Sequence, residues 1–166
     1  MENQEVLAVV RASMPRRWLG VTMLAALGLL LLYTAMSRPP ENLFWQLFLL
    51  VIGGLALWGA ERMYRATAYA VELTEAGLRS TSGEMIAPME EIVAVDRGTF
   101  VFKPSNGFLL KLSAPGTPSR RWAPGLWWRV GRRVGIGGVT PGAQAKMMAD
   151  MLAAMLIERQ AEDEQG

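Results

Sequence analysis

The residues of this chain that are best suited to binding chemistry gather in residues 120–133, where five arginines and three tryptophans lie within fourteen positions. Arginine binds phosphate through a planar, permanently charged group, and tryptophan favours the headgroup zone of a bilayer. We expect this segment to be a loop that contacts an anionic surface. Its candidate contact residues are Arg120, Arg121, Trp122, Trp127, Trp128, Arg129, Arg132 and Arg133.

Two alternative interpretations fit the same composition. In the first, the tryptophans fill the core of a barrel and the arginines are merely solvated. In the second, the arginines contact nucleic-acid phosphates while the tryptophans stack on bases. A domain tethered to a bilayer disfavours the second alternative, so we expect no nucleic-acid partner.

Catalysis and metal binding have little support in the sequence. The chain has no cysteine and no histidine, which excludes disulfides, thiol nucleophiles, Cys/His zinc sites and a histidine base. Glu90 and Glu91 are adjacent, so in a helical turn their side chains point about 100° apart instead of converging. The glycine-rich residues 131–138 lack the Gly-Lys-Ser/Thr ending of a phosphate loop. We therefore expect no enzymatic activity, no cofactor and no metal site.

Two uncharged apolar runs raise the mean hydropathy of the chain to +0.19. Residues 18–37 and 42–60 each approach or reach the ~20 residues with which a helix crosses a bilayer. Pro39 and Pro40 lie between the runs, where a helix cannot continue. The pattern predicts a transmembrane hairpin. A cleaved signal peptide is the alternative for the first run, but that run exceeds the ~7–15 apolar residues of such a peptide.

Basic residues flank the outer ends of the hairpin and predict its orientation. The link between the runs holds only Arg38, so the excess of basic residues at the outer ends predicts cytoplasmic termini. Gly53 and Gly54 lie in the second run, where small residues permit close helix contact, and we expect them to form a packing site. The flanking basic residues are Arg11, Arg16, Arg17, Arg62 and Arg65.

From Ala66 onward, short alternating runs and turn residues predict an antiparallel meander that curls into a small barrel or sandwich. A helix that begins at Thr140-Pro141 would cap it. The strands are expected at residues 69–74, 78–81, 85–87, 93–95, 99–102 and 108–112, with a helical turn over residues 88–92. The helix would bury a face composed of Met147, Met148, Met151, Leu152 and Met155.

Part of this region resembles the bacterial pleckstrin-homology-like (PH-like) membrane proteins. The patterns that carry the resemblance are Tyr69-x-x-x-Leu73-Thr74-x-x-Gly77-Leu78 and Ile86-x-Pro88-x-x-x-Ile92-x-x-Val95. In that family a short transmembrane hairpin precedes a cytoplasmic PH-like domain. The resemblance covers residues 66–158, although residues 120–139 depart from it because they are rich in tryptophan and glycine. It implies binding or assembly rather than catalysis, and it transfers no site residue.

Together these patterns predict a membrane α-hairpin followed by a small, mainly β PH-like barrel with a C-terminal capping helix. The expected function is that of a non-catalytic accessory or scaffold subunit of the bacterial inner membrane. Its hairpin would pack on a larger integral membrane complex, while its domain would dock on anionic phospholipids or an acidic partner. The alternative is a membrane-anchored module that senses anionic lipid. The expected parts are a cytoplasmic segment (1–17), the hairpin (18–65, spans at about 18–37 and 42–61), the domain (66–158) and an acidic, frayed tail (159–166).

Overall fold

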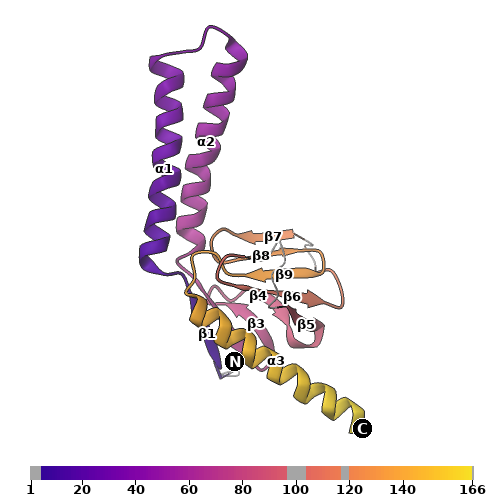
Figure 1. Cartoon of the computed structure of the whole chain (residues 1–166). Helices are drawn as coiled ribbons and strands as arrows, with labels where there is room; N and C mark the ends of the chain where they lie inside the picture. Colours follow the sequence, from indigo (N-terminus) through magenta and orange to yellow (C-terminus); the bar gives the residue numbers. More distant parts are fainter. Residues whose placement is uncertain (1–4, 97–103, 117–119, 166) are drawn as a thin grey trace.

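The computed structural model describes residues 5–96, 104–116 and 120–165. Two long helices, α1 (Met14–Ser37) and α2 (Leu43–Ala66), run side by side as a hairpin. A β domain lies at the end of the hairpin where α1 begins and α2 ends (Figure 1). Both helices are long enough and apolar enough to cross a membrane. The structure thus confirms the predicted order of an apolar hairpin, a mainly β domain and a C-terminal helix.

The β domain consists of two antiparallel sheets. The 3-10 turn η1 (Met89–Glu91) connects the last strand of the first sheet to the first strand of the second. The expected strand at residues 99–102 lies outside the described residues. The first sheet has the order β1 (Ala8–Arg11), β2 (Ala70–Thr74), β3 (Gly77–Ser80) and β4 (Met85–Pro88). The second has the order β5 (Ile92–Asp96), β6 (Phe108–Leu112), β9 (Arg133–Ile136), β8 (Trp127–Val130) and β7 (Arg120–Ala123).

Strand β1 precedes the hairpin in the chain but belongs to the domain that follows it. It pairs with β2 along its whole length, with Val10 opposite Val71, and both of these side chains are fully buried. We had expected residues 1–17 to be a segment separate from the domain at 66–158. The two ends of the hairpin are instead joined by the hydrogen bonds of one strand pair.

Further contacts fix the base of the hairpin to the domain. The Ser13 amide donates to the Val139 carbonyl at 2.8 Å, and the Arg16 guanidinium donates to the Thr140 carbonyl at 2.9 Å. Met63, near the end of α2, is buried, and an added Cβ on Gly125 would lie 3.2 Å from its Cε atom. The hairpin therefore packs on the domain directly and is not joined to it by a free linker.

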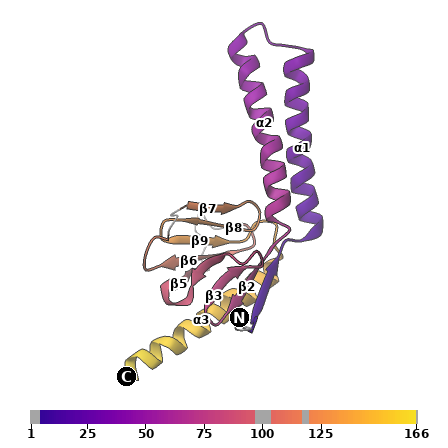
Figure 2. The same ribbon diagram turned by 180° about the vertical axis from the view of Figure 1, so that it is seen from behind.

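The core contains residues of both sheets and of the C-terminal helix α3 (Gly142–Gln165), which contacts β1, β5 and β6. Met148 and Leu152 of α3 are fully buried, as predicted. Met147 and Met151, expected on the same face, are instead 47% and 37% exposed, because the buried stripe is centred on Met148, Leu152 and Leu156. The helix continues past the domain to Gln165 (Figure 2), so residues 159–165 are helical and not frayed as expected.

Candidate functional site

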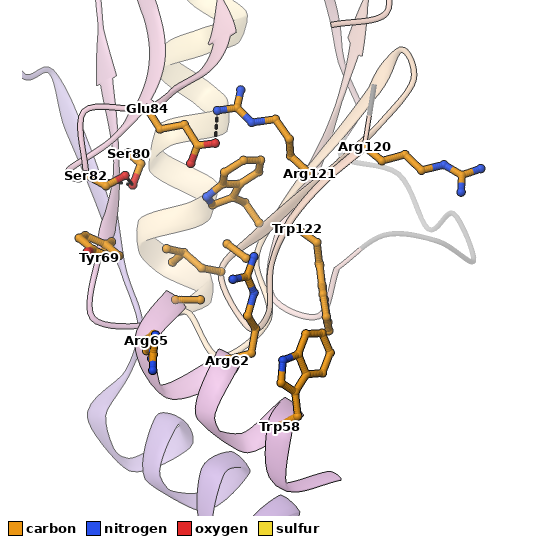
Figure 3. Close-up of a pocket in the computed structure, with 14 residues that line it drawn as sticks. Trp58, Arg62, Arg65, Tyr69, Ser80, Ser82, Glu84, Arg120, Arg121 and Trp122 are labelled. Carbon is orange, nitrogen blue, oxygen red and sulfur yellow. Dashed lines mark hydrogen bonds and ion pairs between the residues drawn. The ribbon is translucent and has the colours of Figure 1, made fainter. Parts of the chain in front are cut away.

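A groove of about 530 Å3 lies where the end of α2 meets the β domain (Figure 3). Three parts of the chain line it: the last turns of α2, the turn region of the first sheet, and the β7–β8 hairpin. Both ribbon views show β7 as the strand of the second sheet nearest the hairpin end, so this edge strand forms one wall (Figures 1 and 2). Its polar lining includes four arginines and one glutamate, so the groove has a net positive charge.

The α2 wall presents Trp58, Arg62 and Arg65. Their spacing of four and three residues places them on one face of the helix. Arg65 is ion-paired with Glu61 one turn earlier. Among the residues that the structure describes, Arg62 has no ion-pair partner, and its side chain points into the groove in Figure 3. The guanidinium of Arg62 is therefore free to bind an anion.

The opposite wall is held in place by Arg121 of β7. Its guanidinium donates to the Met85 carbonyl at 2.9 Å and forms an ion pair with Glu84 (Figure 3). The same guanidinium lies 5.8 Å from the centre of the Trp127 ring. Because Glu84 and Met85 belong to the first sheet region and Arg121 to the second sheet, these contacts bridge the two sheets beside the groove.

The arginine- and tryptophan-rich segment is not the loop that we expected. Residues 120–130 form the β7–β8 hairpin, in which neighbouring side chains point to opposite faces. Trp127 and Arg129 share the inner face of the hairpin and are 3% and 4% exposed. Arg129 is therefore not available to a surface ligand, and Trp127 is reached only from the groove that it lines. Trp128, on the other face, lies against Gly135 of the neighbouring strand.

Arg129 is a structural side chain of the domain interior. Its guanidinium donates to the Ile86 carbonyl at 2.9 Å and to the Glu91 carboxylate at 3.1 Å. An added Cβ on Gly116 would lie 2.2 Å from the guanidinium carbon, so only glycine leaves room for the charged group there. Like Arg121, this residue ties the second sheet to the edge strand β4.

The other members of the predicted set lie apart from one another. Trp122 is half exposed and lines the groove together with Trp58. Arg120 is exposed, and its side chain points away from the groove in Figure 3. Arg132 donates to the Ser113 carbonyl and Arg133 is exposed on β9, and neither lines the groove. The structure therefore gathers only part of the predicted set at the groove, namely Arg120, Arg121, Trp122 and Trp127, and of these Arg120 directs its side chain away.

The two glycines predicted to pack within the membrane have different environments. Gly53 is buried against α1, where an added Cβ would lie 3.1 Å from the Gly28 carbonyl oxygen. Gly54 is exposed, with no atom within 4 Å of such a Cβ. Gly53 therefore packs inside the hairpin, and Gly54 lies on its outer surface.

The described residues offer no metal-binding cluster, since no three of their acidic, histidine or cysteine side chains converge. Glu91, considered above for catalysis, is occupied by its ion pair with Arg129. Comparison of the chain with family models, with curated proteins and with solved structures found no match. The PH-like resemblance stays a prediction.

Sequence reasoning missed the contribution of α2 to the site. Arg62 was interpreted only as one of the basic residues that set the orientation of the hairpin. The spacing of Trp58, Arg62 and Arg65 on one helical face was visible in the sequence and could have indicated a shared surface. Glu84, across the groove, could not be found in this way because it approaches α2 only through the tertiary fold.

Proposed function

We propose that the protein is a non-catalytic docking protein of the bacterial inner membrane, anchored by a two-span hairpin. The observation that carries the proposal is the pairing of β1 with β2, which flank the hairpin on either side. A strand pair of this kind requires both ends of the hairpin to lie on the same side of any membrane that it crosses. The β domain is then held directly against that membrane.

The surface of the hairpin supports its insertion into lipid. Leu30 of α1 is 60% exposed and Val51 of α2 is 58% exposed, and large apolar side chains are exposed along both helices. Extended apolar surfaces on soluble monomers are rare, and they mark membrane or protein contacts. Since apolar side chains are exposed around both helices, lipid is the environment that best keeps them out of water.

The charges at the base of the hairpin support a cytoplasmic domain. Arg16 and Arg17 lie at the start of α1, and Arg62 and Arg65 at the end of α2. Positive residues within short segments beside a span are retained on the cytoplasmic side. Arginines at this level also face the anionic headgroups of the inner leaflet, which supports docking of the domain on lipid headgroups.

A second candidate function is that of an accessory subunit in a larger membrane complex. The observation that favours it is the outward position of Gly54, where no atom lies within 4 Å of an added Cβ. Small residues on an outer helix face allow another helix to approach closely. In this form of the proposal the hairpin packs on a partner, while the domain docks on headgroups or on an acidic subunit.

Fractionation of cells that express the full chain tests the anchored function. We expect the protein in the membrane fraction, resistant to an alkaline wash and released by detergent; release by the alkaline wash alone would contradict insertion. Purification in mild detergent, followed by mass spectrometry of co-purifying chains, tests the accessory function. A monodisperse monomer without co-purifying chains would count against that second candidate and leave the first in place.

A further inference from the structure

The outer face of α2 forms a continuous track into the groove. Val51, Leu55 and Trp58 are all more than half exposed, and Arg62 follows on the same side of the helix. The spacings of four, three and four residues keep all four side chains within a narrow stripe. The stripe therefore changes from aliphatic to aromatic to cationic as it approaches the domain.

This order of side chains matches the order of groups in a phospholipid. Acyl chains pack on aliphatic side chains, tryptophan favours the boundary with the headgroups, and arginine forms charge-assisted hydrogen bonds with phosphate. The uncharged run of α2 ends at Ala60, two residues before Arg62, so this guanidinium is placed where a membrane-spanning helix reaches the phosphates. A soluble anion would satisfy the arginine but would leave the apolar part of the track without a partner.

The charge balance of the groove favours an anionic occupant. Glu84 is the only acidic residue that lines the described groove, and its carboxylate is already paired with Arg121. Glu61, outside the groove, pairs with Arg65. Of the four arginines that line the groove, Arg62 and Arg120 have no ion pair among the described residues. Arg120 points away from the groove, whereas Arg62 points into it, with the indole rings of Trp58 and Trp122 beside it (Figure 3).

The volume of the groove is suitable for such a ligand. About 530 Å3 lies within the range of roughly 300–1,000 Å3 that is typical of small-molecule sites. The hydroxyl groups of Ser80 and Ser82 also line it and are hydrogen-bonded to each other at 2.9 Å. They give the side of the groove opposite α2 a polar surface for a headgroup.

We infer that the groove between α2 and β7 holds one anionic phospholipid. Its phosphate binds Arg62, and its acyl chains follow the stripe formed by Val51, Leu55 and Trp58. The inference depends on the proposed membrane insertion and adds to it a defined lipid site. It predicts that the protein prefers an anionic lipid because of the charge of Arg62, and not because of the total charge of the domain.

The test uses the full chain purified in detergent, titrated with phosphatidylglycerol or with phosphatidylcholine of the same acyl chains. Native mass spectrometry counts the bound lipids. We expect one phosphatidylglycerol to bind more tightly than phosphatidylcholine. Arg62→Ala should weaken phosphatidylglycerol binding about fivefold, the loss expected for one arginine–phosphate contact near a membrane surface. Arg62→Lys should recover part of that affinity because it keeps the charge.

Two further variants separate the parts of the site. Arg133→Ala removes the same charge from an exposed residue outside the groove and should leave binding unchanged. Trp58→Ala should weaken binding of both lipids, because it alters the apolar track and not the phosphate contact. Equal losses in Arg62→Ala and Arg133→Ala, or equal affinity for the two lipids, would overturn the inference.

A soluble competitor distinguishes a lipid from a free phosphate compound. We expect glycerol 3-phosphate at millimolar concentration to leave the bound phosphatidylglycerol in place. Complete displacement would contradict the binding of acyl chains along α2. Failure of the lipid test in a protein that still resists alkaline extraction from membranes would overturn this site alone. Loss of membrane association itself would instead contradict the proposed function.

Discussion

Replacing Arg129 should destabilise the β domain more than any other single loss of charge in the described arginine-rich segment. Its side chain is 5% exposed, and it donates to both the Ile86 carbonyl and the Glu91 carboxylate. Removal of one partner from a buried ion pair costs about 3–5 kcal/mol. Glu91 is 31% exposed and can rehydrate, which lowers the expected loss for Arg129→Ala to about 2–3 kcal/mol.

Thermal unfolding of the full chain in detergent measures this loss. Near-ultraviolet circular dichroism reports the packing of the aromatic side chains, among them Trp127, which is buried on the same hairpin as Arg129. A loss of about 2–3 kcal/mol corresponds to a fall in Tm of roughly 10 °C for a domain of this size. Arg129→Met keeps most of the side-chain volume. Any loss of stability in this variant therefore comes from the missing hydrogen bonds and not from a cavity.

Two comparisons make the result interpretable. Arg133→Ala removes the same charge from an exposed position and should change stability by less than about 0.5 kcal/mol. Glu91→Gln should cost about 1 kcal/mol, since its partly exposed carboxylate is screened by solvent. If Arg129→Ala and Arg133→Ala melt at the same temperature, our assignment of Arg129 as a buried bridge between the sheets is wrong.

Two further pairs of substitutions test the assembly of the fold. Val10→Lys places a charge at a fully buried residue of β1 and should unfold the domain or lower its Tm strongly. Val9→Lys, on the partly exposed face and directly opposite Glu72, should be tolerated, as near-ultraviolet circular dichroism would show. Equal tolerance of both would argue against β1 as part of the sheet. In the hairpin, Gly53→Val should cost about 1–3 kcal/mol because its Cβ meets α1, while Gly54→Val should be neutral in detergent melting experiments. A reversed order would contradict the packing of the two helices.

The elements found correctly in the sequence are those fixed by local patterns. The hairpin follows from two uncharged runs separated by Pro39 and Pro40, and β2 and β3 follow from alternation around a turn that ends in Gly77. In each case the deciding interaction lies within a few residues along the chain.

The elements that were missed depend on distant partners. The four residues of β1 acquire their role from β2, which lies beyond the entire hairpin in the chain. Residues 159–165 carry several charges and few apolar residues, yet they continue α3 because the preceding turns are anchored in the core. Local composition alone favoured fraying there.

The candidate site was likewise predictable only where local patterns decide it. Composition identified the arginines and tryptophans, but it could not distinguish surface from interior. The two-residue period of a strand would have paired Trp127 with Arg129 on one face and separated both from Trp128, had the segment been interpreted as a strand. Arg62 comes close to the β7–β8 hairpin only in the tertiary fold, because α2 contacts β7 only when the α1–α2 hairpin is packed on the domain.

We propose that the α1–α2 hairpin crosses a membrane twice, with the β domain held on the side of both termini. Since the chain has no cysteine, single cysteines can be labelled in intact cells or oriented vesicles without background. We expect Glu75→Cys, in an exposed turn of the domain, to be labelled only from the cytoplasmic side, and Glu41→Cys, at the tip of the hairpin, only from the opposite side. Labelling of both positions by an impermeant reagent from the same side would contradict the account.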